Sequence, residues 1–362
     1  MHFEFDGEQV MVRDSARRFL AGQATVDLKI AADEGPDGFD RKVWSDIAEL
    51  GWLSFAAARD PAEITYLGIL ADEIGRASFA SPFQGCVRAS ILLARAGAPQ
   101  AVLDSIGAGG RIAGIVRSDT AAGRFALKDG LLTGEAALVE WGNSLDLLVV
   151  PIAAGEKVCV VVVDLAKNGV ARSSVETFDN ARAASISCQG VAIGDQDIFE
   201  LPAARFREAL AISDLLLASE AVGGAFGALD LTVAYVKERH QFGHPIAAFQ
   251  AVRHGLADVR GLAEGAWLAV WDGLSTAASG GAVEGKAAVA SWAAKRAFQD
   301  AALKGSQYHG GMGHVVESHM QFFYRRAGTF HGRMPSEWSI LGKIADSYVT
   351  PNLTPRETGV VG

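Results

Sequence analysis

Apolar residues in the first hundred positions recur every three or four residues, which is the period of an amphipathic helix. Trp44, Ile47 and Leu50 show this spacing just before a glycine, where a helix commonly ends. Residues 8–20 have a similar pattern. The first part of the chain, residues 1–110, is therefore predicted to be a helical domain of several short helices.

A different pattern follows, in which short runs rich in β-branched residues alternate with turn-forming residues. The runs that are candidate strands lie at residues 112–116, 147–152, 158–163 and 184–188. Residues 153–156 include Gly155 and separate two of these runs, as a hairpin turn does. We expect a small β-domain over residues 111–202.

The helical period returns over residues 203–362, which are predicted to form a four-helix bundle. Three long helical segments come first, at residues 206–239, 246–278 and 283–305. In the second segment, the steps of three and four between apolar residues predict a buried face, made of Phe249, Val252, Leu256 and Val259. The three parts together predict an α+β fold that is mostly α.

The most apolar stretch of the chain lies at residues 210–231. Asp214, Glu220 and Asp230 interrupt it, and charged side chains are costly inside a bilayer. We therefore expect a central bundle helix and no membrane span. Glu220 can either face a subunit or substrate cavity or make a contact between helices, and the sequence leaves both interpretations open.

Composition narrows the class of protein further. With 49% hydrophobic and 21% charged residues, the chain is expected to be globular and to bury sizeable cores. Its positive mean hydropathy indicates apolar surface buried between chains, so we expect an oligomer. A net charge of -9 argues against nucleic-acid binding. The N-terminus shows no pattern of a secretory signal, which favours a cytoplasmic location.

Cysteine and histidine spacing gives no sign of a metal site. The three cysteines are widely spaced in apolar contexts, which predicts reduced, buried thiols at Cys86, Cys159 and Cys188. Three histidines recur every five residues, at His309, His314 and His319. Metal ligation from a helix requires spacings of three or four residues, so no metal is expected.

Two segments in the last third of the chain have the most specific chemistry. The first, Arg-His-Gln-Phe-Gly-His-Pro-Ile-Ala-Ala-Phe-Gln at residues 239–250, places Arg239 at a helix end, where a guanidinium can bind a phosphate through two hydrogen bonds. The second, Gln-Tyr-His-Gly-Gly-Met-Gly at residues 307–313, has glycines whose backbone N–H groups can approach an anion. Taken singly, each segment also fits a plain helix end or connector.

In this order, separated by two long helices, the two segments resemble the signature of the acyl-CoA dehydrogenase family, and the resemblance extends over nearly the whole chain. In that family the β-domain of one subunit holds the flavin ring, while these segments of a neighbour hold the pyrophosphate and adenosine. The resemblance implies FAD as cofactor, an acyl-CoA substrate, and electron-transfer flavoprotein or a similar electron acceptor. It assigns the contacts to the ADP end of FAD to Arg239, Gln241, Phe242, Gln250, Gln307, Gly310 and Gly311.

The chain departs from the family pattern in the half of the site that a subunit keeps for itself. The flavin loop, usually Thr-Glu-Pro followed by Gly-Ser-Asp, falls on residues 116–123, where neither half is present. The ring-packing Trp-Ile-Thr strand falls on residues 138–140, which places Glu140 where a hydroxyl is usual. The catalytic glutamate falls near Met334, and a second family position for this base falls near Ser213. Asp214 is adjacent to Ser213 but is turned about 100° around the helix, which makes it a weak candidate for the base.

These departures leave three hypotheses. The first is a degenerate partner subunit of a heteromeric acyl-CoA dehydrogenase, such as the heterotetramers of bacterial steroid side-chain degradation. The second is a self-sufficient homo-oligomeric dehydrogenase or another flavin enzyme of this fold, with Asp214 or Glu140 in an unusual role. The third is a cofactor-free scaffold that keeps the fold for assembly alone.

Overall fold

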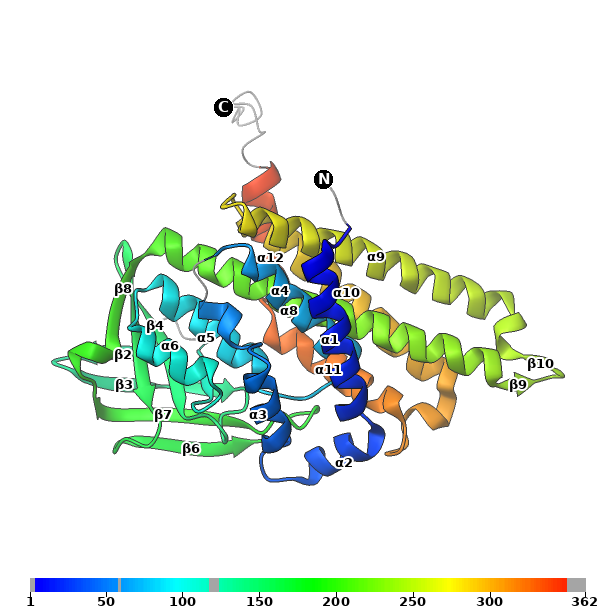
Figure 1. Cartoon of the computed structure of the whole chain (residues 1–362), viewed down its shortest axis with the longest axis horizontal. Coiled ribbons are helices and arrows are strands. Elements are labelled where there is room, and N and C mark those ends of the chain that lie inside the picture. The colour runs from blue at the N-terminus through cyan, green and yellow to red at the C-terminus, as the bar shows by residue number, and fades with distance from the viewer. Residues whose placement is uncertain (1–3, 58–59, 117–123, 350–362) are drawn as a thin grey trace, which may run out of the picture.

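The computed structural model of the chain describes residues 4–57, 60–116 and 124–349. Short helices come first, two small sheets follow, and long helices complete the molecule (Figure 1). The predicted fold class, α+β and mostly α, is confirmed. The first sheet begins at Ala113 and the first long helix at Ala203. The division into domains at residues 110 and 202 remains a proposal.

The first three N-terminal helices begin at polar caps. Asp6 forms a capping box, because its carboxylate accepts from the backbone N–H of Gln9 at 2.8 Å while the Gln9 side chain accepts from the backbone of Asp6. Thr25 and Asp40 cap the next two helices in a similar way. The helices are α1 (Gly7–Gln23), α2 (Val26–Glu34), α3 (Arg41–Glu49), α4 (Glu63–Arg76), α5 (Phe83–Arg95) and α6 (Gln100–Gly107).

The strands form two four-stranded sheets, with orders β1-β4-β5-β8 and β2-β3-β7-β6. Their bounds are β1 (Ala113–Ile115), β2 (Phe125–Lys128), β3 (Leu131–Val139), β4 (Leu147–Ala154), β5 (Lys157–Asp164), β6 (Val170–Val175), β7 (Ala183–Ala192) and β8 (Ile198–Pro202). The predicted hairpin is confirmed, since β4 and β5 pair through a turn at Gly155, whose φ is 66°. Strand β6 was not predicted from the sequence, because its residues are largely exposed and polar and do not form an apolar run.

Long helices form the core of the C-terminal part. Helix α8 (Ala203–Glu238) leads through the short hairpin β9 (His240–Gln241) and β10 (His244–Pro245) to α9 (Gln250–Ala278) and α10 (Glu284–His309). A 3-10 turn (Gly310–Gly313), α11 (His319–Arg333), α12 (Glu337–Ile344) and a π-helical turn (Ala345–Val349) complete the described chain. Among the described helices, α8 alone is long and apolar enough to cross a bilayer. Its most apolar window is 94% buried inside the protein, as in a core helix.

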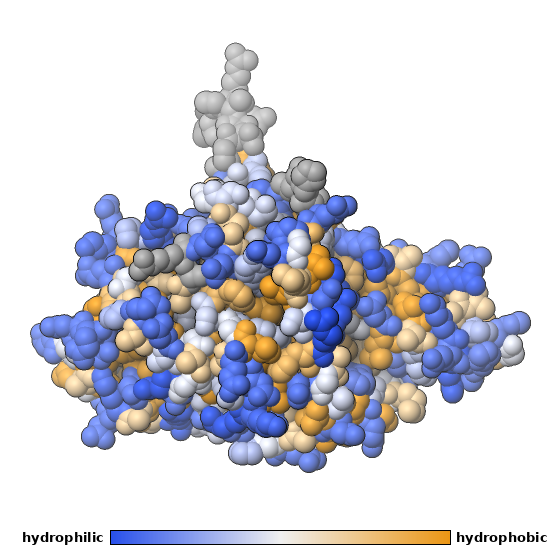
Figure 2. All heavy atoms as spheres, in the orientation of Figure 1, coloured by the Kyte–Doolittle hydropathy of each residue, from blue (hydrophilic) through white to orange (hydrophobic). Residues whose placement is uncertain are grey.

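The predicted buried face of α9 is wrong for its first turns. Phe249 is 40% exposed and both Val252 and Leu256 are half-buried, whereas burial starts at Val259. The reason is tertiary: the start of α9 and the preceding hairpin project beyond the rest of the bundle (Figure 1). Other apolar residues also reach the surface among polar ones (Figure 2).

Helices α4 and α8 pack with unusually close backbones. A Cβ added at Gly75 would lie 1.9 Å from the carbonyl oxygen of Glu220, and one added at Gly223 would lie 1.9 Å from that of Asp72. No side chain fits at either contact, so these glycines set the separation of the two helices.

The variant Gly75→Ala is expected to lower the free energy of unfolding by about 1–3 kcal/mol, because the new methyl group forces two backbones apart. Urea denaturation of the variant and the wild type measures this difference. The matched control is Gly22→Ala in α1, where no atom lies within 4 Å of the added Cβ. That change is expected to be neutral or to stabilise by up to about 1 kcal/mol. Equal unfolding midpoints for the two variants would contradict the packing argument.

Candidate functional site

The two segments that the sequence singled out meet at the projecting end of the bundle. The ring of His309, at the end of α10, stacks on Tyr235 of α8 with centroids 4.2 Å apart. The neighbouring Tyr308 donates its hydroxyl to the carbonyl of Ala251 in the first turn of α9, at 3.5 Å. The glycine-rich loop therefore lies beside the hairpin and the start of α9, although about sixty residues separate them in sequence (Figure 1).

Side chains on the hairpin are open to solvent. Arg239 ends α8, where its backbone N–H donates to the carbonyl of Tyr235 at 2.8 Å, and its side chain is exposed. No carboxylate lies within 4.0 Å of its guanidinium in the described part of the chain. Phe242 is 89% exposed and has a φ of 53°, while the Gln241 amide donates to the carbonyl of His240.

The glycine-rich loop leaves its backbone accessible. Gly310 ends α10 with a φ of 60°, a conformation that favours glycine. A Cβ added at Gly310 or Gly311 would meet no atom within 4 Å. Gln250 and Gln307 are both exposed, one on each side of the two segments. All seven residues predicted to contact the ADP end of FAD thus lie at one end of the molecule.

His309 is the buried member of this region. Its Nδ1 lies 2.8 Å from the carbonyl of Gly305, and burial lowers the pKa of the imidazole. It packs against Tyr235 and holds the end of α10 in place. Within residues 4–57, 60–116 and 124–349, no group of three His, Cys, Asp or Glu side chains is arranged to hold a metal ion.

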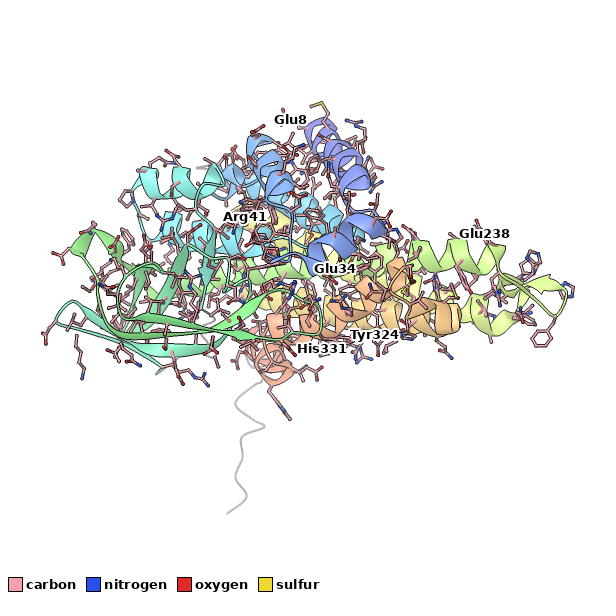
Figure 3. All side chains as sticks on the ribbon, turned by 90° about the horizontal axis from the view of Figure 1, so that it is seen from below. Glu8, Glu34, Arg41, Glu238, Tyr324 and His331 are labelled. Carbon is pink, nitrogen blue, oxygen red and sulfur yellow. The ribbon has the colours of Figure 1, made fainter. Side chains whose placement is uncertain are left out.

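A second region lies far from the projecting end, where β-strands, N-terminal helices and α11 meet. In Figure 3, Glu238 at the end of α8 is distant from His331 of α11, which lies near this region. Two adjoining cavities occur here, of about 300 Å³ and about 160 Å³. The larger one is lined by residues 138–140, the strand that corresponds to the family's ring-packing strand. Residues 117–123 of the expected flavin loop lie outside the described residues.

Arg333, at the end of α11, occupies the boundary between the cavities. Its Nε lies 2.7 Å from Glu140 Oε1, and its guanidinium also pairs with Asp179. Asp179 in turn accepts from the Thr329 hydroxyl at 2.8 Å. Both Asp179 and Arg333 line both cavities. The ion pairs therefore separate the two spaces.

The charges at this boundary stabilise one another. Burial by itself disfavours the charged form of Arg333, but the nearby carboxylates of Glu140, Asp179 and Glu220 outweigh it and raise its pKa. Burial likewise opposes ionisation of Asp179, and Arg333 and hydrogen bonds hold the pKa of that carboxyl below its usual value. Both groups are therefore charged at neutral pH.

Glu220 is buried and pairs with Arg326 of α11, which also donates to the carbonyl of Phe79. The interpretation of Glu220 as a satisfied contact between helices is confirmed. Arg325 makes a similar contact, since its Nη1 lies 2.6 Å from Asp33 Oδ2 in α2. These ion pairs attach α11 to the N-terminal helices and to α8.

The two sequence positions for a catalytic base contain no suitable carboxylate. Met334 is 2% exposed, and its backbone N–H donates to the carbonyl of Phe330 at the end of α11. Asp214 lies 3.9 Å from Lys343 of α12. Neither residue lines the two cavities at the second region.

Sequence reasoning missed the partnership of Arg333 and Asp179. The sequence could have indicated that Arg333 lies near the site, because this residue directly precedes Met334, the position aligned with the catalytic glutamate. Asp179 had no such signal, since it lies in an irregular link between β6 and β7, where no periodicity applies.

Comparisons with known proteins show which family this fold and these segments resemble. Residues 204–331 match the family model described as acyl-CoA dehydrogenase, C-terminal domain. Acyl-CoA dehydrogenase IpdE2 of Mycolicibacterium smegmatis is 26% identical over 330 residues, which cover 88% of this chain and 92% of that protein. Residues 204–331 therefore match the C-terminal domain of acyl-CoA dehydrogenases, and the similarity along most of the chain supports membership of the acyl-CoA dehydrogenase family.

Solved structures show the same fold. The ChsE4-ChsE5 complex from Mycobacterium tuberculosis superposes with a TM-score of 0.89 at 21% identity, covering 98% of this chain and 100% of that one. A variant of the steroid ACAD (acyl-CoA dehydrogenase) Tcur3481-Tcur3483 superposes with a TM-score of 0.86 at 24% identity, covering 95% and 98% of the two chains.

Proposed function

We propose that this chain is the non-catalytic subunit of a heteromeric acyl-CoA dehydrogenase, and that its projecting bundle end binds the ADP end of FAD held by a partner subunit. The observation that carries the proposal is a contrast between the two regions. The exposed Arg239 has no carboxylate partner among the described residues, whereas Arg333 and Glu140 form an ion pair beside the expected ring position.

The donor set at the bundle end fits the ADP end of FAD. A free guanidinium at Arg239 can bind a pyrophosphate through two parallel hydrogen bonds. The backbone at Gly310 and Gly311 is open to an approaching phosphate or ribose. Exposed apolar surface at Phe242 is suited to burial against another subunit.

The ring region does not fit a flavin held by this chain. Flavin reduction builds up negative charge at the ring, and the usual hydroxyl donor is replaced by Glu140, whose ionised carboxylate only accepts hydrogen bonds. The nearby cation, Arg333, is bound to Glu140 and Asp179. The position of the catalytic glutamate holds Met334, which cannot take a proton. We therefore assign this region a structural role.

When bound, FAD supplies the hydride acceptor for α,β-dehydrogenation of an acyl-CoA thioester. The accompanying proton needs a carboxylate placed against the substrate α-carbon. In this proposal the partner subunit provides that carboxylate and holds the flavin ring. This chain contributes Arg239, the surrounding polar side chains and the exclusion of water at the ADP end.

Relatives support the heteromeric assembly. ChsE4-ChsE5 is a complex of two different chains, and Tcur3481-Tcur3483 is a steroid ACAD. By analogy we propose a heterotetramer in the cytoplasm that oxidises a ring-bearing acyl-CoA and passes electrons to electron-transfer flavoprotein or a similar acceptor.

The self-sufficient dehydrogenase remains the second candidate, because Glu140 lines the larger cavity and belongs to the segment on which the expected ring strand falls. It requires Glu140 to accept a proton from the substrate. The ion pair with Arg333 acts against this role, because Glu140 Oε1 lies 2.7 Å from Arg333 Nε and is already engaged by the guanidinium.

Flavin content of the purified chain tests the proposal. We expect the chain alone to be colourless or to aggregate, and its complex with the partner to hold one FAD for each pair of unlike chains. Absorbance at the flavin bands and the mass of each assembly measure this. One tightly bound flavin per chain in a homo-oligomer would favour the self-sufficient enzyme. An assembled complex without flavin would instead favour the scaffold.

A further inference from the structure

The smaller cavity, of about 160 Å³, contains polar groups that the proposed function does not use. It lies between α2, the loop before α3, the β-domain and α11. Figure 3 shows α2, which ends at Glu34, beside α11, which carries Tyr324. Most of its surface is apolar, with aromatic rings from Phe39, Phe79, Trp141 and Phe322.

Lys29 of α2 places a buried amine in this cavity, and the amine lacks a carboxylate partner in the described chain. The residue is 8% exposed, and no described carboxylate lies within 4.0 Å of Nζ. The amine lies 3.5 Å from His319 Nδ1 and above the rings of Phe322 and Phe323. An ammonium group has three N–H donors, so this single long contact leaves it under-satisfied.

Ser78 is a second, independent polar group on the same cavity. It is 3% exposed, and its hydroxyl has no hydrogen-bond partner among the described residues. Its backbone has a φ of 47°, a left-handed conformation that is unfavourable for a residue with a Cβ. Buried unsatisfied groups and such backbone outliers are common where a ligand binds.

The charged groups around the cavity are otherwise matched. Asp33 pairs with Arg325, Asp179 pairs with Arg333, and the Asp40 carboxylate caps α3. Because these carboxylates are engaged, an anion that satisfies Lys29 must come from outside the described chain.

We propose that this cavity binds a small ring-bearing carboxylate, whose oxygens accept hydrogen bonds from Lys29 and Ser78 while the ring lies among the aromatic side chains. The volume supports this class of ligand, since an apolar cavity of about 150 Å³ is known to hold a benzene molecule. The inference stands apart from the proposed function, because it involves neither FAD nor the projecting bundle end.

Benzoate titrated into the full chain, alone or in complex with its partner, is the direct test. Isothermal titration calorimetry is expected to show saturable binding to the wild type. The variant Lys29→Met should weaken it by at least about tenfold, because a charge-assisted hydrogen bond is lost. Ser78→Ala should cause a smaller loss. Lys343→Met, a change at a half-exposed lysine of α12 that lines neither cavity beside Lys29, is the control and should bind as the wild type does.

The affinity for benzoate should also fall about tenfold between pH 6 and pH 8. Burial, together with the nearby Arg326, lowers the pKa of Lys29 to about 7, so the amine loses its charge over this interval. The other titratable and charged groups that line the cavities beside Lys29 are Asp33, Asp40, Arg76, Asp179, His319, Arg325 and Arg333. His319 gains charge as the pH falls, which favours the anion in the same direction.

Three results would overturn the assignment. The first is no saturable binding by the wild type, and the second is unchanged affinity in Lys29→Met. The third is tighter binding of inorganic phosphate than of benzoate, because phosphate cannot use the apolar part of the cavity. The neutral analogue benzamide separates charge from shape, since it should bind the wild type and Lys29→Met with similar affinity.

Discussion

Replacing Arg239 with alanine is expected to remove FAD from the complex of this chain with its partner while the fold stays intact. The guanidinium is exposed and has no carboxylate partner among the described residues, so its removal breaks no internal ion pair. A bidentate contact to pyrophosphate contributes about 1.5–3 kcal/mol, which corresponds to FAD affinity weakened by about 10- to 150-fold. Flavin absorbance per chain after dialysis, and titration of FAD into the apo-complex, measure the loss.

Three control variants define what the Arg239 result means. Arg239→Lys keeps the charge but loses the planar pair of donors, so an intermediate affinity is expected. Arg205→Ala removes an exposed arginine near the other end of α8, about 51 Å away along the helix axis, and should leave FAD binding unchanged. Met334→Ala should leave turnover of the complex nearly unchanged. Full FAD occupancy and activity in Arg239→Ala would refute the assignment of the ADP end.

The predictable part of the site is the part that local sequence determines. Residues 239–250 form a helix end, a tight hairpin and a helix start, and each of these features depends on neighbours within a few positions. The glycine-rich loop follows α10 directly, so its backbone accessibility also comes from local sequence. Helical periods and the β4–β5 hairpin were predicted for the same reason.

The unpredictable part depends on contacts between distant residues. Arg333 and Asp179 are 154 residues apart, and no local pattern relates an irregular link to the end of a helix. At the start of α9 the sequence instead predicted burial that the structure lacks. Phe249 and Val252 have the period of a buried helix but lie where the bundle projects. Periodicity identifies an apolar face and does not specify which neighbour covers it.

The variant Arg333→Met is expected to lower the free energy of unfolding by about 3–5 kcal/mol, because it leaves two buried or half-buried carboxylates without their cation. Asp179 and Glu140 then face each other's charge at the boundary of the cavities. Urea denaturation measures the loss. The control is Lys157→Met, which breaks an exposed ion pair with Glu200 and should leave the unfolding midpoint close to that of the wild type.

The pH dependence of this loss provides an independent check. Asp179 has a lowered pKa in the folded protein, so its ionised form stabilises the fold above its ordinary pKa of 3.8, and this stabilisation is lost as pH falls through the folded value. Arg333→Met removes the main attraction that lowers this pKa. The difference in stability between the wild type and the variant should therefore shrink as the pH falls below about 4. A difference that does not change with pH would show that packing, and not charge, causes the loss.

Glu140 is the residue at which stability and catalysis can be separated. If it acts only as a partner of Arg333, Glu140→Gln should lower stability and leave turnover of the complex nearly unchanged. The double variant Arg333→Met with Glu140→Gln should then recover part of the stability lost in Arg333→Met, because one uncompensated charge is gone. If Glu140 is the base of a self-sufficient enzyme, Glu140→Gln should abolish turnover whatever its effect on stability. Stability and turnover, both measured on Glu140→Gln, therefore distinguish a subunit that has lost its active site from an enzyme that uses Glu140 as its base.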